Sequence, residues 1–249
     1  MFPIRDHNPS ERRPFITYAL LALNTLVFLY MWPLYGSTAA SQVFVDYGMI
    51  PQRLTHGVGL ETLVTSMFLH GGFMHFAGNM LFLWIFGDNL EDMLGHVRFL
   101  LFYLATGIAA AMLQLASDPS SPIPMVGASG AIAGVMGGYL LLFPKAKVDV
   151  LFIIVIIFRI IPIPAWAALL VWFGLQVFNG VASFGADGGG VAHWAHAGGF
   201  IAGFALILPL WLRLGAQRFW SYTDGHPDHP EARYKIARTS IPQAGRRRK

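Results

Sequence analysis

The sequence contains no cysteine and few charged residues. The absence of cysteine excludes a disulfide framework, a zinc–thiolate site and a thiol nucleophile. Charged residues make up 12% of the 249 positions, about half of the ~25% that is usual for soluble domains. Because 55% of the residues are hydrophobic, much of the surface is expected to face lipid rather than water.

Positive charge is also scarce outside the two ends of the chain, where most of the net charge of +4 is concentrated. The basic run Arg246–Lys249 suggests nucleic-acid binding at first sight. We prefer a cytoplasmic tail beside an anionic membrane face, because the rest of the chain is so apolar. No nucleic-acid partner is therefore predicted, and no sequence pattern fixes an oligomeric state.

Long apolar runs are abundant, and each bilayer-crossing helix needs roughly 20 mostly apolar residues. The sequence predicts an all-α, six-span membrane bundle over 15–213, after a polar cytoplasmic tail (1–14) and before a basic, flexible tail (214–249). The six expected spans cover 15–32, 73–90, 98–116, 128–143, 164–183 and 192–212.

The apolar segment 148–161 is too short for a further crossing, and Pro162 and Pro164 close it. We expect it to be interfacial or re-entrant. Six spans place nearly all Lys and Arg residues on the side that holds both termini, whereas the other side holds only Arg53. The positive-inside rule therefore predicts cytoplasmic termini in an inner-membrane, multi-pass protein. The connection 34–72 is then external.

Polar residues gather near the external ends of three expected spans, where they are costly and so suggest function. The second span opens with His70, His75 and Asn79. His75 and Asn79 are four residues apart and share one helix face, which suits two donors to an oxyanion. For His70 we favour a structural role, bracing the loop.

The fourth span opens with Gly127-Ala128-Ser129-Gly130. A serine at a helix start is usually only a cap. However, the unpaired N–H groups of a helix N-terminus can bind a developing negative charge, and the flanking glycines leave the hydroxyl open. Ser129 is therefore a candidate nucleophile.

The sixth span carries His193 and His196 near its start. A pair spaced i, i+3 can bind a metal, but the pattern is not H-E-x-x-H and no acidic residue accompanies it. We therefore favour His196 as a general base and His193 as an interfacial or supporting residue. No Asp or Glu lies at this depth to orient His196, so a dyad is predicted rather than a triad.

Small residues connect the last two clusters. Gly130, Gly134 and Gly138 form one stripe, and Gly199 and Gly203 form another. Such stripes let helix backbones approach closely. If the stripes face each other, the Ser129 hydroxyl and the His196 imidazole meet, and a neutral histidine can accept the serine proton.

These residues together resemble the rhomboid family. The resemblance runs from about Tyr47 to Leu212 and includes, in order, His70, His75 and Asn79, Gly87-x3-Glu91-x3-Gly95, Gly-Ala-Ser129-Gly, and Ala195-His196-x2-Gly199-x3-Gly203. The pattern is similar to a bacterial six-span form. One departure concerns a tyrosine that some relatives place one turn after the serine, to stack on the histidine; Ala133 stands there. Trp194 or Phe200 is a candidate replacement.

The resemblance implies a serine endopeptidase that cleaves transmembrane protein substrates near their external end, without a cofactor or metal. It implies Ser129 as nucleophile and His196 as base, with the Ser129 N–H, His75 and Asn79 stabilising the oxyanion. Glu91, Gly127, Gly130, Gly199 and Gly203 would be structural. The fifth span, about 164–181, would be a lateral gate.

Two other classes of function were weighed. A non-catalytic protein that binds transmembrane segments is disfavoured by the intact serine and histidine. A small-solute transporter is disfavoured because no internal repeat is evident and the polar groups gather on one side.

Overall fold

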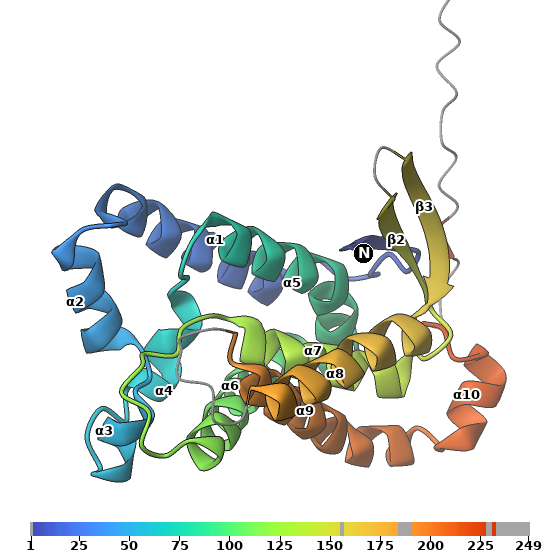
Figure 1. Cartoon of the computed structure of the whole chain (residues 1–249). Helices are drawn as coiled ribbons and strands as arrows, with labels where there is room; N and C mark the ends of the chain where they lie inside the picture. The colour runs from blue at the N-terminus through green and yellow to red at the C-terminus, as the bar shows by residue number, and fades with distance from the viewer. Residues whose placement is uncertain (1, 155–156, 184–190, 228–230, 233–249) are drawn as a thin grey trace, which may run out of the picture.

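The computed structural model describes residues 2–154, 157–183, 191–227 and 231–232. It is a mostly helical bundle with a small three-stranded sheet at one end (Figure 1). The principal helices are α1 (Phe15–Met31), α5 (Phe73–Leu94), α6 (His96–Ser117), α7 (Ser129–Leu142), α8 (Ala165–Ala182) and α9 (His193–Arg213). All six expected helices are thus present within a few residues of their predicted bounds.

Four of these helices, within the described residues, are long and apolar enough to cross a membrane: α1 with its 3-10 extension η1 (Trp32–Leu34), α6, α8 and α9. Helix α5 is as long as α6 but carries Asp88, Glu91 and Asp92 near its end. Helix α7 has 14 residues, a length of about 21 Å.

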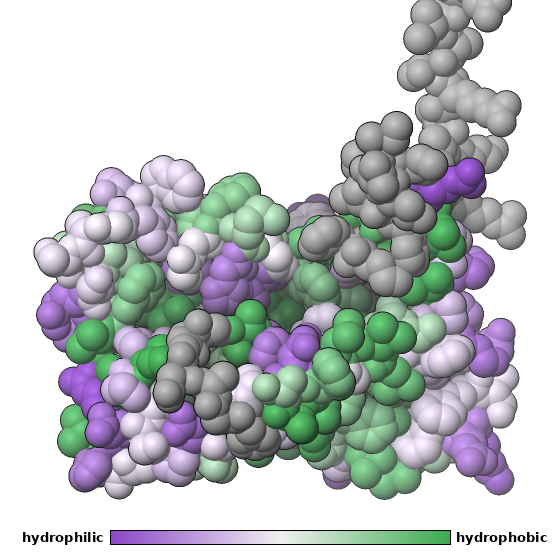
Figure 2. Space-filling model, viewed as in Figure 1, coloured by the Kyte–Doolittle hydropathy of each residue, from purple (hydrophilic) through white to green (hydrophobic). Residues whose placement is uncertain are grey.

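The short α7 lies at the centre of the bundle. Every residue from Gly130 to Leu142 is buried, as expected for a helix that is apolar on all sides. It packs against α5, α6, α8 and α9, and the large side chains Phe86, Tyr103 and Tyr139 fill the core around it. Exposed apolar side chains face outward instead, and Figure 2 shows a broad hydrophobic surface over α8 and α9.

Short helices form the long connection between α1 and α5 at one end of the bundle. They are α2 (Thr38–Tyr47), α3 (Pro51–Thr55), α4 (Thr62–Thr65) and the 3-10 turn η2 (Ser66–Phe68). Backbone bonds tie this region to the loop before α7: Met49 and Met125 pair in an antiparallel bridge, and the Gln52 N–H donates to the Ser121 carbonyl. The connection therefore supports the loop that leads to Ser129.

The opposite end carries the sheet, which the sequence interpretation missed. Strands β2 (Lys147–Ile154) and β3 (Ile157–Pro164) form an antiparallel hairpin with Val150 opposite Ile161. The segment 148–161, expected to be interfacial or re-entrant, thus contributes to two paired strands that the sequence interpretation did not predict. Both strands are rich in the β-branched residues Val and Ile, which suit a strand. The apolar character of the segment imitated a membrane segment.

Both ends of the described chain join this region. Residues 2–6, expected to be part of a tail, form β1 (Phe2–Asp6), which pairs antiparallel with β2. The start of the segment expected to be a flexible C-terminal tail contains helix α10 (Gln217–Thr223). Phe219 is buried, and the Trp220 indole donates to the Leu141 carbonyl at 2.9 Å. The basic run 246–249 lies outside the described residues.

Candidate active site

Ser129 is the first residue of α7, and a glycine with an unusual backbone precedes it. Gly127 has φ +129°, a conformation that L-residues rarely adopt, and its N–H donates to the Ser66 carbonyl at 2.9 Å. A Cβ at Gly127 would lie 2.7 Å from the His75 ring and 3.4 Å from Ser129 Oγ. The glycine therefore leaves room for His75 beside the serine. The N–H groups of the first turn of α7 lack helical carbonyl partners.

His196 lies in the first turn of α9, with its Nε2 atom 2.8 Å from Ser129 Oγ. The glycine stripes make this approach possible. A Cβ at Gly199 would fall 1.9 Å from the Gly130 carbonyl oxygen, and one at Gly203 would fall 1.9 Å from that of Gly134. The two backbones are in direct contact, so the expected facing of the two stripes is confirmed.

The other side of the His196 ring contacts α8. Gln176 Oε1 lies 2.8 Å from His196 Nδ1 and 2.9 Å from His193 Nδ1. The Trp172 ring lies 5.7 Å from the His196 ring, at an interplanar angle of 33°. Trp172 therefore supplies the tilted ring beside His196, whereas the candidates that the sequence offered for this place were Trp194 and Phe200.

The two rejected candidates have other neighbours. Trp194 packs against Gly180 of α8, and Phe200 stacks on Phe173 at 4.7 Å between ring centroids. Both contacts still join α9 to α8, so the aromatic rings fix the relative position of these helices around His196.

His75, Asn79 and His70 lie along the start of α5. The Gly71 N–H donates to His75 Nδ1 at 3.3 Å, and the Nε2 edge of the ring faces Gly127. The Asn79 amide donates to the His75 carbonyl at 2.9 Å, rather than to an atom beside Ser129. His70 is buried against His75 and Phe76, and its carbonyl accepts a bond from the Tyr35 hydroxyl at 2.6 Å. Its ring nitrogens have no hydrogen-bond partner among the described residues.

Glu91 is far from Ser129 and binds the start of α1. Its buried carboxylate accepts the N–H groups of Ile16 and Thr17 at 2.9 and 2.8 Å, and the Thr17 hydroxyl at 2.8 Å. These N–H groups belong to the first turn of α1, which has no side-chain cap of its own. His96 Nδ1 contacts the same carboxylate at 2.5 Å. Glu91 therefore joins α1, α5 and α6.

Sequence reasoning missed Gln176 and Trp172 beside the histidine. A signal for Gln176 existed, since a glutamine inside the apolar run 165–182 is costly unless it is hydrogen-bonded. Gln114 of α6 is similar, and its Oε1 accepts the Ala195 N–H at 3.2 Å at the start of α9. Trp172 gave no such signal, because an aromatic residue in an apolar helix is ordinary.

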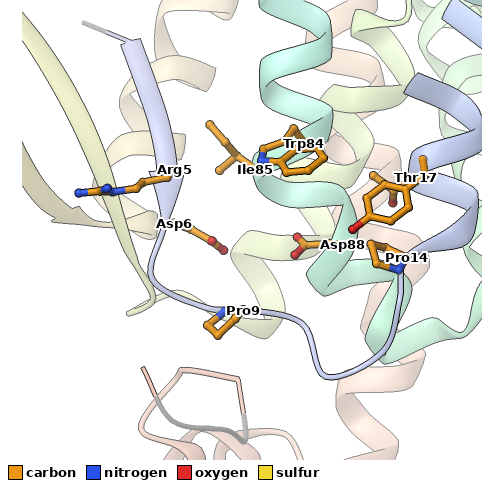
Figure 3. Close-up of a pocket in the computed structure, with 9 residues that line it drawn as sticks. Arg5, Asp6, Pro9, Pro14, Thr17, Trp84, Ile85 and Asp88 are labelled. Atoms are coloured by element: carbon orange, nitrogen blue, oxygen red, sulfur yellow. The ribbon is translucent and has the colours of Figure 1, made fainter. Parts of the chain in front are cut away.

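A second polar cluster at the sheet end was also missed. Asp6 and Asp88 face each other in a cavity of about 200 Å³ between β1, α1 and α5 (Figure 3). Asp6 accepts hydrogen bonds from Asn89 and Tyr139 at 3.0 and 3.1 Å. Burial, and then the charge of Asp88, raise the pKa of Asp6 to about 7. The cluster attaches the N-terminal strand to α5 and α7.

Comparisons with known proteins agree with this architecture. The family model described as the Rhomboid domain matches residues 59–213. The chain is 36% identical over 197 residues to Rhomboid protease GluP of Bacillus subtilis, covering 79% of this chain and 36% of that protein. It is 31% identical over 195 residues to the mitochondrial Rhomboid protein 1 of Saccharomyces cerevisiae, covering 76% of this chain and 51% of that protein.

The chain thus spans about a third of the length of the first relative and about half of the length of the second. The family model nevertheless covers more than half of the chain and contains the Ser129–His196 pair. Together with the apolar helices, the match shows that this multi-pass helical membrane protein belongs to the rhomboid family.

Proposed function

We propose that the chain is an intramembrane serine endopeptidase in which Ser129 is the nucleophile and His196 the general base. The observation that carries the proposal is the 2.8 Å contact between Ser129 Oγ and His196 Nε2 at the start of α7. A serine hydroxyl is a weak nucleophile until a base within hydrogen-bond reach accepts its proton. The two relatives named above belong to the same family, and the name of one describes a protease.

The reaction is acyl transfer. Ser129 Oγ attacks the scissile carbonyl carbon while its proton moves to His196 Nε2. The tetrahedral intermediate collapses when the imidazolium gives that proton to the leaving amine, and an acyl-enzyme remains. A water molecule then attacks the ester carbonyl while its proton moves to the same imidazole. The imidazolium returns that proton to Ser129 Oγ as the ester bond breaks and the acid is released.

His75 is well placed to stabilise the oxyanion. Because the Gly71 N–H donates to its Nδ1, neutral His75 carries its proton on Nε2, the atom that faces Gly127. The N–H of Ser129 at the start of α7 is a second donor. Asn79 becomes a third if its side chain turns from the His75 carbonyl, which it now binds.

The charge distribution supports cleavage near the external face. The sheet end carries Arg5, Arg12, Lys145 and Lys147, which form ion pairs there with acidic side chains. Ser129 begins α7 at the opposite end, beside α4 and η2 (Figure 1). Under the positive-inside rule the sheet end is cytoplasmic, so both termini lie in the cytoplasm of an inner-membrane protein and Ser129 lies toward the outside.

A transmembrane substrate reaches Ser129 most directly past α8. This helix exposes Leu170, Val171, Leu175 and Phe178, a face that suits lipid, and it contacts His196 through Trp172. An outward displacement of α8 opens a lateral path from the bilayer to the dyad. This is the gate that the family resemblance implies.

The test is cleavage in reconstituted vesicles. Purified protein is mixed in liposomes with a panel of single-span substrates, and mass spectrometry of the fragments locates the scissile bond. Cleavage within the external third of the span by wild type, and its loss in Ser129→Ala and His196→Ala, supports the proposal. Cleavage that persists in Ser129→Ala, or a cut at the cytoplasmic end, contradicts it.

A further inference from the structure

Gln176 is the polar residue of α8 that contacts the candidate dyad. Its side chain is buried, with 9% exposed, although its neighbours Leu175 and Phe178 are exposed on the same helix. A buried amide needs hydrogen-bond partners. Gln176 finds them on α9, where its Oε1 atom lies 2.8 Å from His196 Nδ1 and 2.9 Å from His193 Nδ1.

In this orientation of the amide, the oxygen only accepts hydrogen bonds, so each of these Nδ1 atoms carries the proton. The neutral His196 ring then has an unprotonated Nε2, and this atom faces Ser129 Oγ at 2.8 Å. That tautomer is the one able to take the serine proton. The reversed amide would donate to Nδ1, place the ring proton on Nε2, and leave no base for Ser129.

The oxygen orientation also suits the later steps of the reaction. When His196 gains a proton it becomes an imidazolium, which donates from both ring nitrogens. Gln176 Oε1 can accept from Nδ1 in both states, whereas an amide N–H group in the same place would oppose the imidazolium. His193, held by the same oxygen, provides a second bond that restrains the amide.

We propose that Gln176 is a positioning residue that holds His196 in the tautomer needed for catalysis. The inference rests on the proposed function. It extends the Ser129–His196 dyad to a hydrogen-bonded series of three side chains, Ser129, His196 and Gln176. It also makes the dyad sensitive to α8. Ser129 and His196 are held together by the α7–α9 glycine contacts, but the orienting oxygen leaves with α8 when that helix moves outward.

The direct test is ¹⁵N NMR of the wild-type protein with ring-labelled histidine, which distinguishes the two neutral tautomers. The chain has nine histidines, so the His196 signals are assigned by comparison with His196→Ala. The proposal expects Nδ1–H with a free Nε2. An Nε2–H tautomer in the folded protein overturns it.

Kinetics of three variants give the second test. Gln176→Met keeps the side-chain length without an acceptor oxygen, and we expect kcat to fall by about 10- to 100-fold with little change in KM. Gln176→Glu keeps an acceptor oxygen and should recover most of that rate. Gln114→Met is the matched control, because Gln114 binds the Ala195 N–H rather than a ring; it should leave the His196 tautomer unchanged.

The outcomes separate this inference from the proposed function. If Ser129→Ala abolishes cleavage while Gln176→Met retains the wild-type kcat, Gln176 has no positioning role and the dyad stands. If Gln176→Met and Gln176→Glu lose the same rate, the residue acts only in packing, and the inference is wrong. If Ser129→Ala still cleaves, the proposed function itself fails.

Discussion

Substitution of Gly199 by alanine tests whether the backbone contact of α7 with α9 sets the geometry of the dyad. The added Cβ would lie 1.9 Å from the Gly130 carbonyl oxygen, although real Cβ atoms essentially never approach within 3.0 Å. Because the opposing atom is backbone, no side-chain rotation relieves the clash. Helix α9 must therefore retreat from α7 by about 1 Å.

His196 lies one turn before Gly199 on the same helix, so it moves with the retreating backbone. The Nε2–Oγ distance of 2.8 Å would lengthen to nearly 4 Å, beyond the usual range of a hydrogen bond. A misplacement of about 1 Å can cost about 10²-fold in rate. We expect a loss of this size in kcat, with overpacking costing a further ~1–3 kcal/mol in stability.

The assay is cleavage of a single-span substrate in liposomes, with thermal unfolding measured in parallel. Gly174→Ala is the matched control, since a Cβ at Gly174 of α8 would meet nothing within 4 Å; it should keep the wild-type rate. A folded Gly199→Ala protein that cleaves as fast as wild type would refute the argument that this contact positions the dyad.

Three other perturbations have definite expected results. Glu91→Ala removes the carboxylate that binds the first turn of α1 and should lower the stability by about 2–4 kcal/mol, measured by thermal unfolding in detergent; an unchanged Tm contradicts the capping role. Trp172→Leu removes the ring beside His196 and should lower kcat several-fold, with a smaller change in KM. An effect on KM alone would place Trp172 in substrate binding. Because the pKa of Asp6 is raised from 3.8 to about 7, the native state retains a proton that the unfolded state loses, so docking of β1 should be firmest below about pH 4 and weaken as the pH rises through 7. Hydrogen exchange of residues 2–6 measures this docking. Asp6→Asn should reduce the pH dependence by the contribution of Asp6, and protection of residues 2–6 that increases with pH would contradict the prediction.

The helical part of the fold was predictable because lipid imposes simple rules. Long apolar runs such as 96–117 and 193–213 have few alternatives to a helix in a membrane. Glycines at four-residue spacing also predicted the α7–α9 contact, since each removes the Cβ that would separate the two backbones. The Ser129–His196 contact follows from that packing, which is why two residues 67 positions apart could be paired from sequence.

The sheet end was less predictable. The β2–β3 hairpin is apolar and β-branched, and its pairing with β1 joins residues about 145 positions apart, such as Arg5 and Asp149. Local sequence patterns carry no signal for such a distant partner. Asp6 likewise looks like an ordinary tail residue until Asn89 and Tyr139 are placed around it.

The surroundings of His196 could be predicted only in part. The sequence offered no Asp or Glu as a partner for His196 and did not point to Gln176 and Trp172, which both come from α8. Their contacts depend on the rotation of α8 about its own axis, which an almost uniformly apolar sequence does not specify. The candidates for a ring beside His196 were therefore sought on α9, whereas the ring that lies there comes from α8.

The central claim is that the Ser129 hydroxyl is made nucleophilic by His196, and covalent labelling tests it most directly. A fluorophosphonate probe is incubated with wild type, Ser129→Ala and His196→Ala in liposomes, and the modified residue is mapped by mass spectrometry. The account predicts labelling of wild type at Ser129, with little or none in either variant. Labelling at another residue, or labelling of His196→Ala at the wild-type rate, would contradict it.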